Sequence, residues 1–198
     1  MRRATVTADY DDRAYDSPIP LQRYWQRARY GHVTDLAAGC GAALDVGCGS
    51  SRILGALPPG SVGLDILLGK LHHARKFDRP LVHGDALRLP FPDASFPCVV
   101  CSEVIEHIPL GTPVLDELTR VLAPGGRLVI GTPDYARWEW VALEILYRLA
   151  APGGYADGHI ARYTRASLTA LLAQRGLTLE EVRYVGRGEM ILALRQRC

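Results

Sequence analysis

The feature that most constrains the fold is an alternation that begins at Ala43, where short apolar runs are separated by segments with helical spacing of apolar residues. The runs have the length of buried strands, and the segments between them are long enough for amphipathic helices. The predicted strands are residues 43–46, 62–64, 81–83, 98–101 and 128–130. The predicted helices are residues 51–57, 67–77, 112–122 and 135–150. This alternation predicts a parallel sheet covered on both faces.

The last part of the chain predicts a helix followed by a hairpin. Residues 164–174 carry leucines on one helical face, and Gly176 is a typical helix stop. Strand-like runs follow at residues 177–185 and 190–194, with the turn Gly-Arg-Gly at 186–188 between them. The predicted fold is therefore α/β, with a seven-stranded, mostly parallel sheet, helices on both faces and a C-terminal antiparallel hairpin.

The first 40 residues are less regular. The stretch up to Asp16 is polar, and we expect it to be loose. Residues 19–38 carry apolar side chains at helical spacing, which predicts one or two helices packed ahead of the sheet. We expect the aromatic residues Tyr15, Tyr24 and Trp25 to cover the sheet rather than a ligand.

Charge and composition limit the classes of partner that this chain is expected to bind. The formal net charge is +2 and the arginines are scattered, so neither nucleic acid nor a membrane surface is an expected partner. Charged residues or proline interrupt each hydrophobic run before it reaches membrane-spanning length, and the expected location is cytoplasmic. The five cysteines are expected to be reduced thiols. Cys98 and Cys101 lie three residues apart in a predicted strand, so their side chains should point to opposite faces.

A glycine-rich turn follows the first predicted strand, in the sequence LDVGCGSSR at 44–52. Gly47 and Gly49 allow a tight turn and a close approach of the backbone to a ligand, although a simple strand-to-helix turn has the same residues. The dinucleotide fingerprint requires a small residue at the position of Arg52. A dehydrogenase that binds NAD is therefore disfavoured.

Acidic residues follow three successive predicted strands, at Asp65, Asp85 and Glu103. Ligands of open parallel sheets bind beyond the carboxyl ends of the strands, near the point where strand order reverses. A carboxylate at Asp65 could accept hydrogen bonds from both hydroxyls of a ribose, and one at Asp85 from the amine of an adenine. Asp65 could equally cap the helix that follows it. The acids and the glycine turn together predict a ligand site.

Four stretches resemble the class I S-adenosylmethionine (SAM)-dependent methyltransferases, especially the small-molecule branch that includes the ubiquinone O-methyltransferases. They are LDVGCGSSRIL (44–54), VGLDI (62–66), HGDALRLPFPDASFPCVVCSEVIEHI (83–108) and LTRVLAPGGRLVIGTP (118–133). The resemblance implies a Rossmann-like fold, SAM as cofactor and S-adenosylhomocysteine as product. The third glycine of the loop in that family is replaced here by Ser51, which could cap the next helix.

The resemblance also implies which residues bind the cofactor. The glycine loop would wrap the methionyl end, Asp65 would bind the ribose and Asp85 the adenine. The expected cofactor-binding residues are Asp45, Gly47, Cys48, Gly49, Asp65, Ile66, Asp85, Ala86 and Ser102. We expect a single domain over 1–198, with an N-terminal helical cap (1–40), a SAM-binding core (41–133), acceptor-side helices and a loop (134–176) and a terminal hairpin (177–198).

Methyl transfer depends mainly on positioning the acceptor in line with the methyl group, and a general base adds less. The expected catalytic residues are His107, His159 and Glu103. His107 could instead only pack on the cofactor, and His159 could be a solvated histidine in the glycine-rich connection 153–159, which could act as a lid. In the helix after the fifth strand, we expect Tyr135 to line the acceptor pocket and Trp138 to pack in the core.

Two alternatives remain open beside metal-free transfer to a small-molecule acceptor. Glu103, Glu106 and His107 form E-x-x-E-H, which could hold Mg²⁺ or another divalent ion with His159 as a fourth ligand. The preferred interpretation has no metal. The other alternative is a protein that binds SAM without catalysis. The sequence does not identify the acceptor or the oligomeric state.

Overall fold

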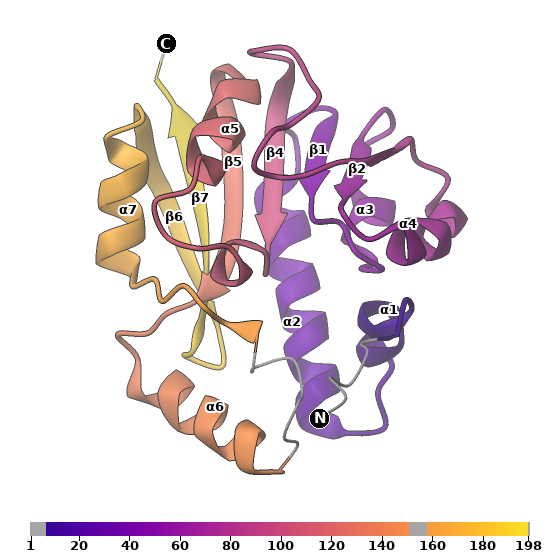
Figure 1. The fold of residues 1–198 in the computed structure, drawn as a ribbon, viewed down its shortest axis with the longest axis vertical. Helices are drawn as coiled ribbons and strands as arrows, with labels where there is room; N and C mark the ends of the chain where they lie inside the picture. The colour runs from indigo at the N-terminus through magenta and orange to yellow at the C-terminus, as the bar shows by residue number, and fades with distance from the viewer. Residues whose placement is uncertain (1–6, 151–157, 198) are drawn as a thin grey trace.

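The computed structural model describes residues 7–150 and 158–197 of the chain, and its fold is drawn in Figure 1. The strands are β1 (Ala43–Val46), β2 (Val62–Asp65), β3 (Leu81–His83), β4 (Phe96–Ser102), β5 (Leu122–Pro133), β6 (Leu177–Val185) and β7 (Glu189–Gln196). The α-helices are α1 (Tyr10–Tyr15), α2 (Pro20–Ala37), α3 (Ile53–Ala56), α4 (Leu68–Ala74), α5 (Val114–Val121), α6 (Trp138–Ala150) and α7 (Arg165–Ala173). Two short 3-10 helices complete the described elements, η1 (Arg75–Phe77) and η2 (Ile105–His107).

The strands form one seven-stranded sheet in the order β3-β2-β1-β4-β5-β7-β6. The first five strands are parallel, and β7 lies antiparallel to both β5 and β6. The predicted fold class, including the C-terminal hairpin, is confirmed. Strand order reverses between β1 and β4, so their carboxyl ends mark the expected ligand position.

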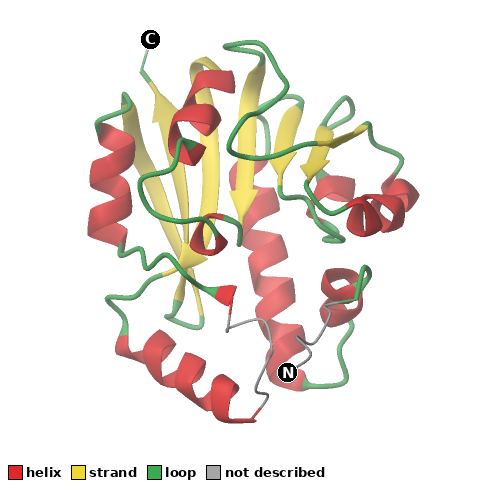
Figure 2. Cartoon of the chain, viewed as in Figure 1, coloured by secondary structure: helices red, strands yellow, loops and turns green. Residues whose placement is uncertain are grey.

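Helices cover both faces of the sheet (Figure 2). Buried side chains of α5 and α7 pack on one face, whereas those of α2, α3 and α4 pack on the other. Cys101 belongs to the first of these cores and Cys98 to the second, which confirms that the two thiols point to opposite faces. The amphipathic helices therefore form because each has one apolar stripe to bury against the strands.

The N-terminal segment differs from the prediction in one respect. The residues expected to be loose include helix α1, whereas residues 19–38 form the single long helix α2, in agreement with the predicted one or two helices. Ion pairs hold α1 against the rest of the chain: Asp12 contacts Arg52 at 2.7 Å and also Lys76, and Asp11 contacts Lys70 at 2.9 Å. A polar helix of this length needs such tertiary contacts, because it buries little apolar surface of its own.

Several elements gather beyond the carboxyl ends of the parallel strands. In Figure 1, α1, α6 and the first half of α2 lie at the lower end of the sheet, toward which β4 and β5 point. Within α6, the prediction that Trp138 packs in the core is wrong, because this side chain is 75% exposed and Trp140 is the buried tryptophan. Within the described residues, no helix has the length and apolar character needed to cross a membrane.

Candidate active site

The glycine turn after β1 has the geometry that the sequence predicts. Gly47 has a φ of 71°, and a Cβ added there would lie 2.2 Å from Cγ2 of Val104, so only glycine fits. Gly49, also at positive φ, donates its N–H to Oδ2 of Asp65 at 2.8 Å. Oγ of Ser51 accepts the N–H of Ile53, which supports the start of α3. The turn is thus tied to β2 and to the helix that follows.

A cavity lies between this turn and the end of β4. Five of the predicted site residues line it: Asp45, Gly47, Cys48, Ser102 and Glu103. The lining also includes Asp11, Gln26, Arg29 and Lys70, which the sequence analysis did not select, together with Ser51 and Ile53. The N-terminal cap therefore closes one side of the cavity.

Three buried polar atoms at this cavity accept or donate no hydrogen bond within the described residues. They are Oδ2 of Asp45, Oγ of Ser102 and Oε1 of Glu103. Buried polar atoms in native proteins are normally paired, so these three indicate a polar ligand. Burial, with the charge of Asp65 as a second cause, raises the pKa of Asp45 to about 7.

The other predicted cofactor residues lie at the neighbouring strand ends and do not line this cavity. Asp65 is buried, and its Oδ1 accepts the N–H of Leu67 at 2.7 Å at the start of α4, so the helix-capping role is present in the structure. Ile66 is 59% exposed and Asp85 is exposed. Ala86 is buried beside them. Of these four residues, Ile66 and Asp85 are open to solvent, whereas Asp65 and Ala86 are buried.

Arg29 joins the cap to the sheet. Its guanidinium contacts the carboxylate of Glu189 at 2.6 Å and that of Glu103 at 3.2 Å, and Trp25 also donates its indole N–H to Glu189. Burial raises the pKa of Glu103 well above its usual range, and Arg29 opposes that rise. Glu103 also has a φ of 58°, a left-handed conformation that is uncommon for residues other than glycine and that aims its side chain at Arg29.

A second and larger cavity adjoins the first. Its walls come from α1, α2 and α6 and from the segment that carries His159, with apolar side chains from Ile19, Leu21, Trp25, Trp140 and Leu143. The rings of Trp25 and Trp140 lie 6.1 Å apart, and Trp140 also stacks on His159. Tyr135 does not line this cavity, and Trp140 takes the position that we expected for it. Both cavities share Asp11, Gln26, Arg29 and Glu103 in their linings.

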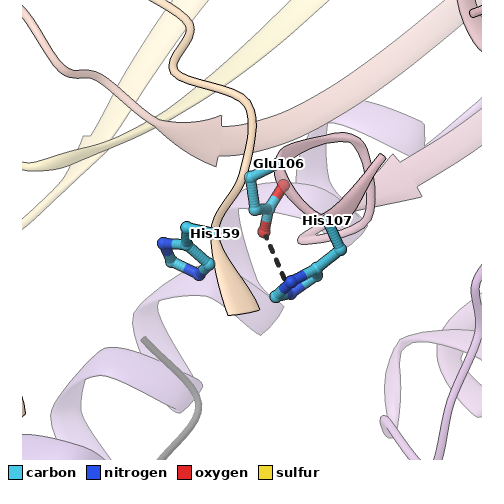
Figure 3. A group of neighbouring side chains, drawn as sticks. All are labelled: Glu106, His107 and His159. Atoms are coloured by element: carbon cyan, nitrogen blue, oxygen red, sulfur yellow. Dashed lines mark ion pairs between the residues drawn. The ribbon is translucent and has the colours of Figure 1, made fainter. Parts of the chain in front are cut away.

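The predicted catalytic histidines lie together with Glu106 (Figure 3). One ligand-type atom from each of Glu106, His107 and His159 lies within 4.8 Å of the others, and Oε1 of Glu106 is 3.9 Å from Nε2 of His107. Glu103 is not part of this group, because its carboxylate pairs with Arg29. His159 is only 9% exposed, so the interpretation of it as a solvated loop histidine is wrong. Residues 153–157 of the proposed lid lie outside the described residues.

Hydrogen bonds fix these side chains. Nδ1 of His107 lies 3.0 Å from the carbonyl oxygen of Gly158, and Nδ1 of His159 lies 3.1 Å from the hydroxyl of Tyr135. Thr132 donates to Oε2 of Glu106 at 3.0 Å. Burial raises the pKa of Glu106 to about 7, and burial also lowers the pKa of His107.

Comparisons with known proteins agree with this geometry. Residues 44–130 match the family model described as a methyltransferase domain. A demethylmenaquinone methyltransferase from Mycobacterium is 38% identical over 116 residues, which are 54% of this chain and 47% of that protein. A Mycolicibacterium smegmatis protein named as a probable S-adenosylmethionine-dependent methyltransferase is 28% identical over 94% of this chain and 76% of its own length. The chain spans about half the length of the curated relatives that it matches.

A solved structure shows the same fold. The N-methyltransferase NodS from Bradyrhizobium japonicum, in complex with S-adenosyl-L-homocysteine, superimposes with a TM-score of 0.67 over 96% of this chain and 98% of its own, at 19% identity. The likeness confirms the Rossmann-like fold. The matched domain and the curated relatives identify the chain as a member of the class I SAM-dependent methyltransferase family.

Proposed function

We propose that the protein transfers a methyl group from SAM to a small-molecule acceptor, with SAM in the cavity at the glycine turn and the acceptor in the larger cavity that adjoins it. The observation that carries the proposal is that the two cavities adjoin and share Arg29 and Glu103 in their walls. A donor and an acceptor bound there would meet at one place. The N-terminal cap (1–40) and the acceptor-side segment (134–176) then supply the walls around the SAM-binding core.

The residues present fit SAM. The unpaired buried oxygens of Asp45, Ser102 and Glu103 offer partners to its ammonium group and hydroxyls, and the glycine turn lets the backbone approach its methionyl part. We assign the ribose and adenine to Asp65, Ile66, Asp85 and Ala86 at the neighbouring strand ends, where Ile66 and Asp85 are open to solvent. Bound there, SAM supplies a methyl group on a sulfonium, already activated for in-line displacement. S-adenosylhomocysteine is the expected product.

The contribution of the protein is mainly positioning. Holding the acceptor about 3 to 3.5 Å from the methyl group, aligned and away from water, contributes roughly 7 to 11 kcal/mol to lowering the barrier. Trp25 and Trp140 bind the apolar body of the acceptor, and Glu103 orients it at the shared wall. The basic Nε2 of His107 accepts a proton where the acceptor must lose one, with His159 beside it.

The experiment that tests this function has two arms. Titration calorimetry measures SAM binding, and incubation with SAM carrying a tritiated methyl group and fractionated extracts of small metabolites measures transfer. We expect saturable binding and label in at least one small-molecule fraction, together with released S-adenosylhomocysteine. Binding without transfer in any fraction would indicate a SAM-binding protein that lacks catalysis. Absence of SAM binding would overturn the proposal itself.

The two tryptophans at the start of α6 give a matched test of the acceptor pocket. We expect Trp140→Ala to raise the KM for the acceptor about tenfold, because a buried ring that packs on Trp25 and His159 is lost. Trp138→Ala removes the same ring from a position that is 75% exposed, and it should leave the KM unchanged. Affinity for SAM, measured by calorimetry, should stay the same in both variants. Equal KM values for Trp140→Ala and the unchanged enzyme would place the acceptor elsewhere.

A further inference from the structure

Glu106, His107 and His159 come from two separate segments, η2 and the stretch after α6, yet their side chains converge. Figure 3 shows the carboxylate of Glu106 pointing toward the ring of His107, with the ring of His159 close by. We propose that these three side chains bind a divalent transition-metal ion at the wall of the acceptor cavity. The role of the ion in catalysis rests on the proposed function, whereas its binding does not.

The hydrogen bonds of the two imidazoles orient them as metal ligands. A carbonyl oxygen only accepts, so Nδ1 of His107 carries the proton that it donates to Gly158, and Nε2 is the nitrogen with a lone pair. The hydroxyl of Tyr135 donates to Glu144 at 3.1 Å, so this hydroxyl accepts from Nδ1 of His159. Nε2 is then the basic nitrogen of His159 too. Outer partners of this kind hold the ligand rings of metal sites in one tautomer.

The carboxylate of Glu106 supplies the third donor. The side chain is fully buried, Thr132 occupies its Oε2, and no hydrogen-bond donor reaches its Oε1 within the described residues. The charge of Arg29 acts on Glu106 and lowers its pKa, but the guanidinium contacts the carboxylates of Glu103 and Glu189. Because a buried charge is costly unless it is paired, a cation beside Oε1 would stabilise this carboxylate.

The donor set selects the class of ion. Two imidazoles and one carboxylate suit zinc and its first-row neighbours better than Mg²⁺, which prefers oxygen ligands and water. Bonds of about 2.1 Å at tetrahedral angles place the ligand atoms of one ion about 3.4 Å apart. The observed separations, at most 4.8 Å, therefore require the side chains to close by up to about 1.4 Å. Three protein ligands leave one position of a tetrahedral site open toward a substrate.

An acceptor with a hydroxyl group would take that open position. Its oxygen coordinates to the ion, which lowers the pKa of the hydroxyl, and the proton leaves to solvent. The oxygen then forms a bond to the methyl carbon as the bond between that carbon and sulfur breaks, so the sulfonium becomes a neutral thioether. In the metal-bound state the ion replaces Nε2 of His107 as the means of deprotonating the acceptor.

Metal binding can be tested without SAM or an acceptor. We would titrate Co²⁺ into the full chain, freed of metal with a chelator, and follow the visible absorption bands of the ion. One equivalent is expected to bind. Glu106→Gln and His159→Ala are each expected to weaken binding at least tenfold, because each removes one ligand. Thermal melting of both variants without metal shows whether they fold.

The control variant is His72→Ala with His73→Ala, which removes two histidines of α4 outside the group. It should bind Co²⁺ as the unchanged chain does. If neither ligand variant weakens binding, or if Co²⁺ does not bind the unchanged chain, the metal site is excluded. Methyl transfer that persists in metal-free protein would leave the proposed function intact and remove the role of the ion in catalysis. Failure of methyl transfer with Co²⁺ still bound would count against the proposed function alone.

Discussion

Replacing Arg29 with methionine is expected to lower the free energy of unfolding by about 3 to 5 kcal/mol. Arg29 is the cation that contacts the buried carboxylates of Glu189 and Glu103, at 2.6 and 3.2 Å. Methionine keeps much of the side-chain volume and removes the charge, so two carboxylates lose their shared partner inside the protein. Breaking a buried pair in this way costs more than the pair itself contributes, because the remaining charge stays desolvated. Urea denaturation, followed by circular dichroism, measures the difference.

Two further variants separate charge from packing. Arg27→Met changes the same residue type on the same helix, but Arg27 forms an exposed pair with Asp16. Its effect should stay within about 1 kcal/mol. Adding Glu189→Gln to Arg29→Met should recover part of the lost stability, because one of the stranded charges is removed. An effect of Arg29→Met no larger than that of Arg27→Met would show that Arg29 does not neutralise these carboxylates.

The sequence predicted the sheet because each of its strands is a local signal. The apolar runs of β1 to β5 alternate with amphipathic helices. A parallel sheet covered by helices on two faces is the simple arrangement that buries both the strands and the apolar faces of the helices. The turn Gly-Arg-Gly likewise separates β6 from β7 in the chain. Strand ends then located the glycine turn, Asp45, Ser102 and Glu103 at one cavity. The prediction of the fold succeeded because it depends on neighbours in the sequence.

Predictions that depended on distant partners failed. The segment before Asp16 is polar and was expected to be loose, but α1 is held by pairs such as Asp12 with Arg52, which lie 40 residues apart. Arg29 and Glu189 meet across 160 residues, and neither carries a motif. The helical spacing of α6 did not distinguish Trp138 from Trp140, because the partner of that helix is Trp25 of the cap rather than the sheet. A charge or an aromatic ring acquires its role from tertiary contacts that one sequence does not show.

Replacing Asp45 with asparagine is expected to stabilise the protein at pH 8 and to weaken SAM binding. Burial, with the charge of Asp65 as a second cause, raises the pKa of Asp45 from 3.8 to about 7 in the folded protein. The folded state therefore holds a proton that the unfolded chain loses between about pH 4 and pH 7, and the free energy of unfolding falls as pH rises through this range. Above pH 7 the charged carboxylate costs about 3 to 4 kcal/mol. Asparagine cannot ionise, so it avoids this cost.

The size of the gain should follow pH. In urea denaturation, Asp45→Asn should exceed the unchanged chain by about 3 kcal/mol near pH 8, and the difference should shrink toward zero as pH falls to about 4. Asp35→Asn removes an exposed carboxylate that pairs with Arg183, and it should change stability by less than about 1 kcal/mol at either pH. If Asp45→Asn were less stable than the unchanged chain near pH 8, Asp45 would not carry a destabilising buried charge at that pH.

The same substitution should weaken SAM binding, although it stabilises the fold. The unpaired Oδ2 of Asp45 faces the cavity that we assign to SAM, and a charged acceptor contributes about 1.5 to 3 kcal/mol to a hydrogen bond. Asp45→Asn should therefore weaken SAM binding by roughly tenfold to a hundredfold in calorimetry at pH 8. The carboxylate of Asp45 would then destabilise the fold but strengthen SAM binding, which indicates that its role is to bind the ligand. Equal SAM affinities in the two proteins would instead mean that Asp45 does not contact the cofactor, and the cavity would need another occupant.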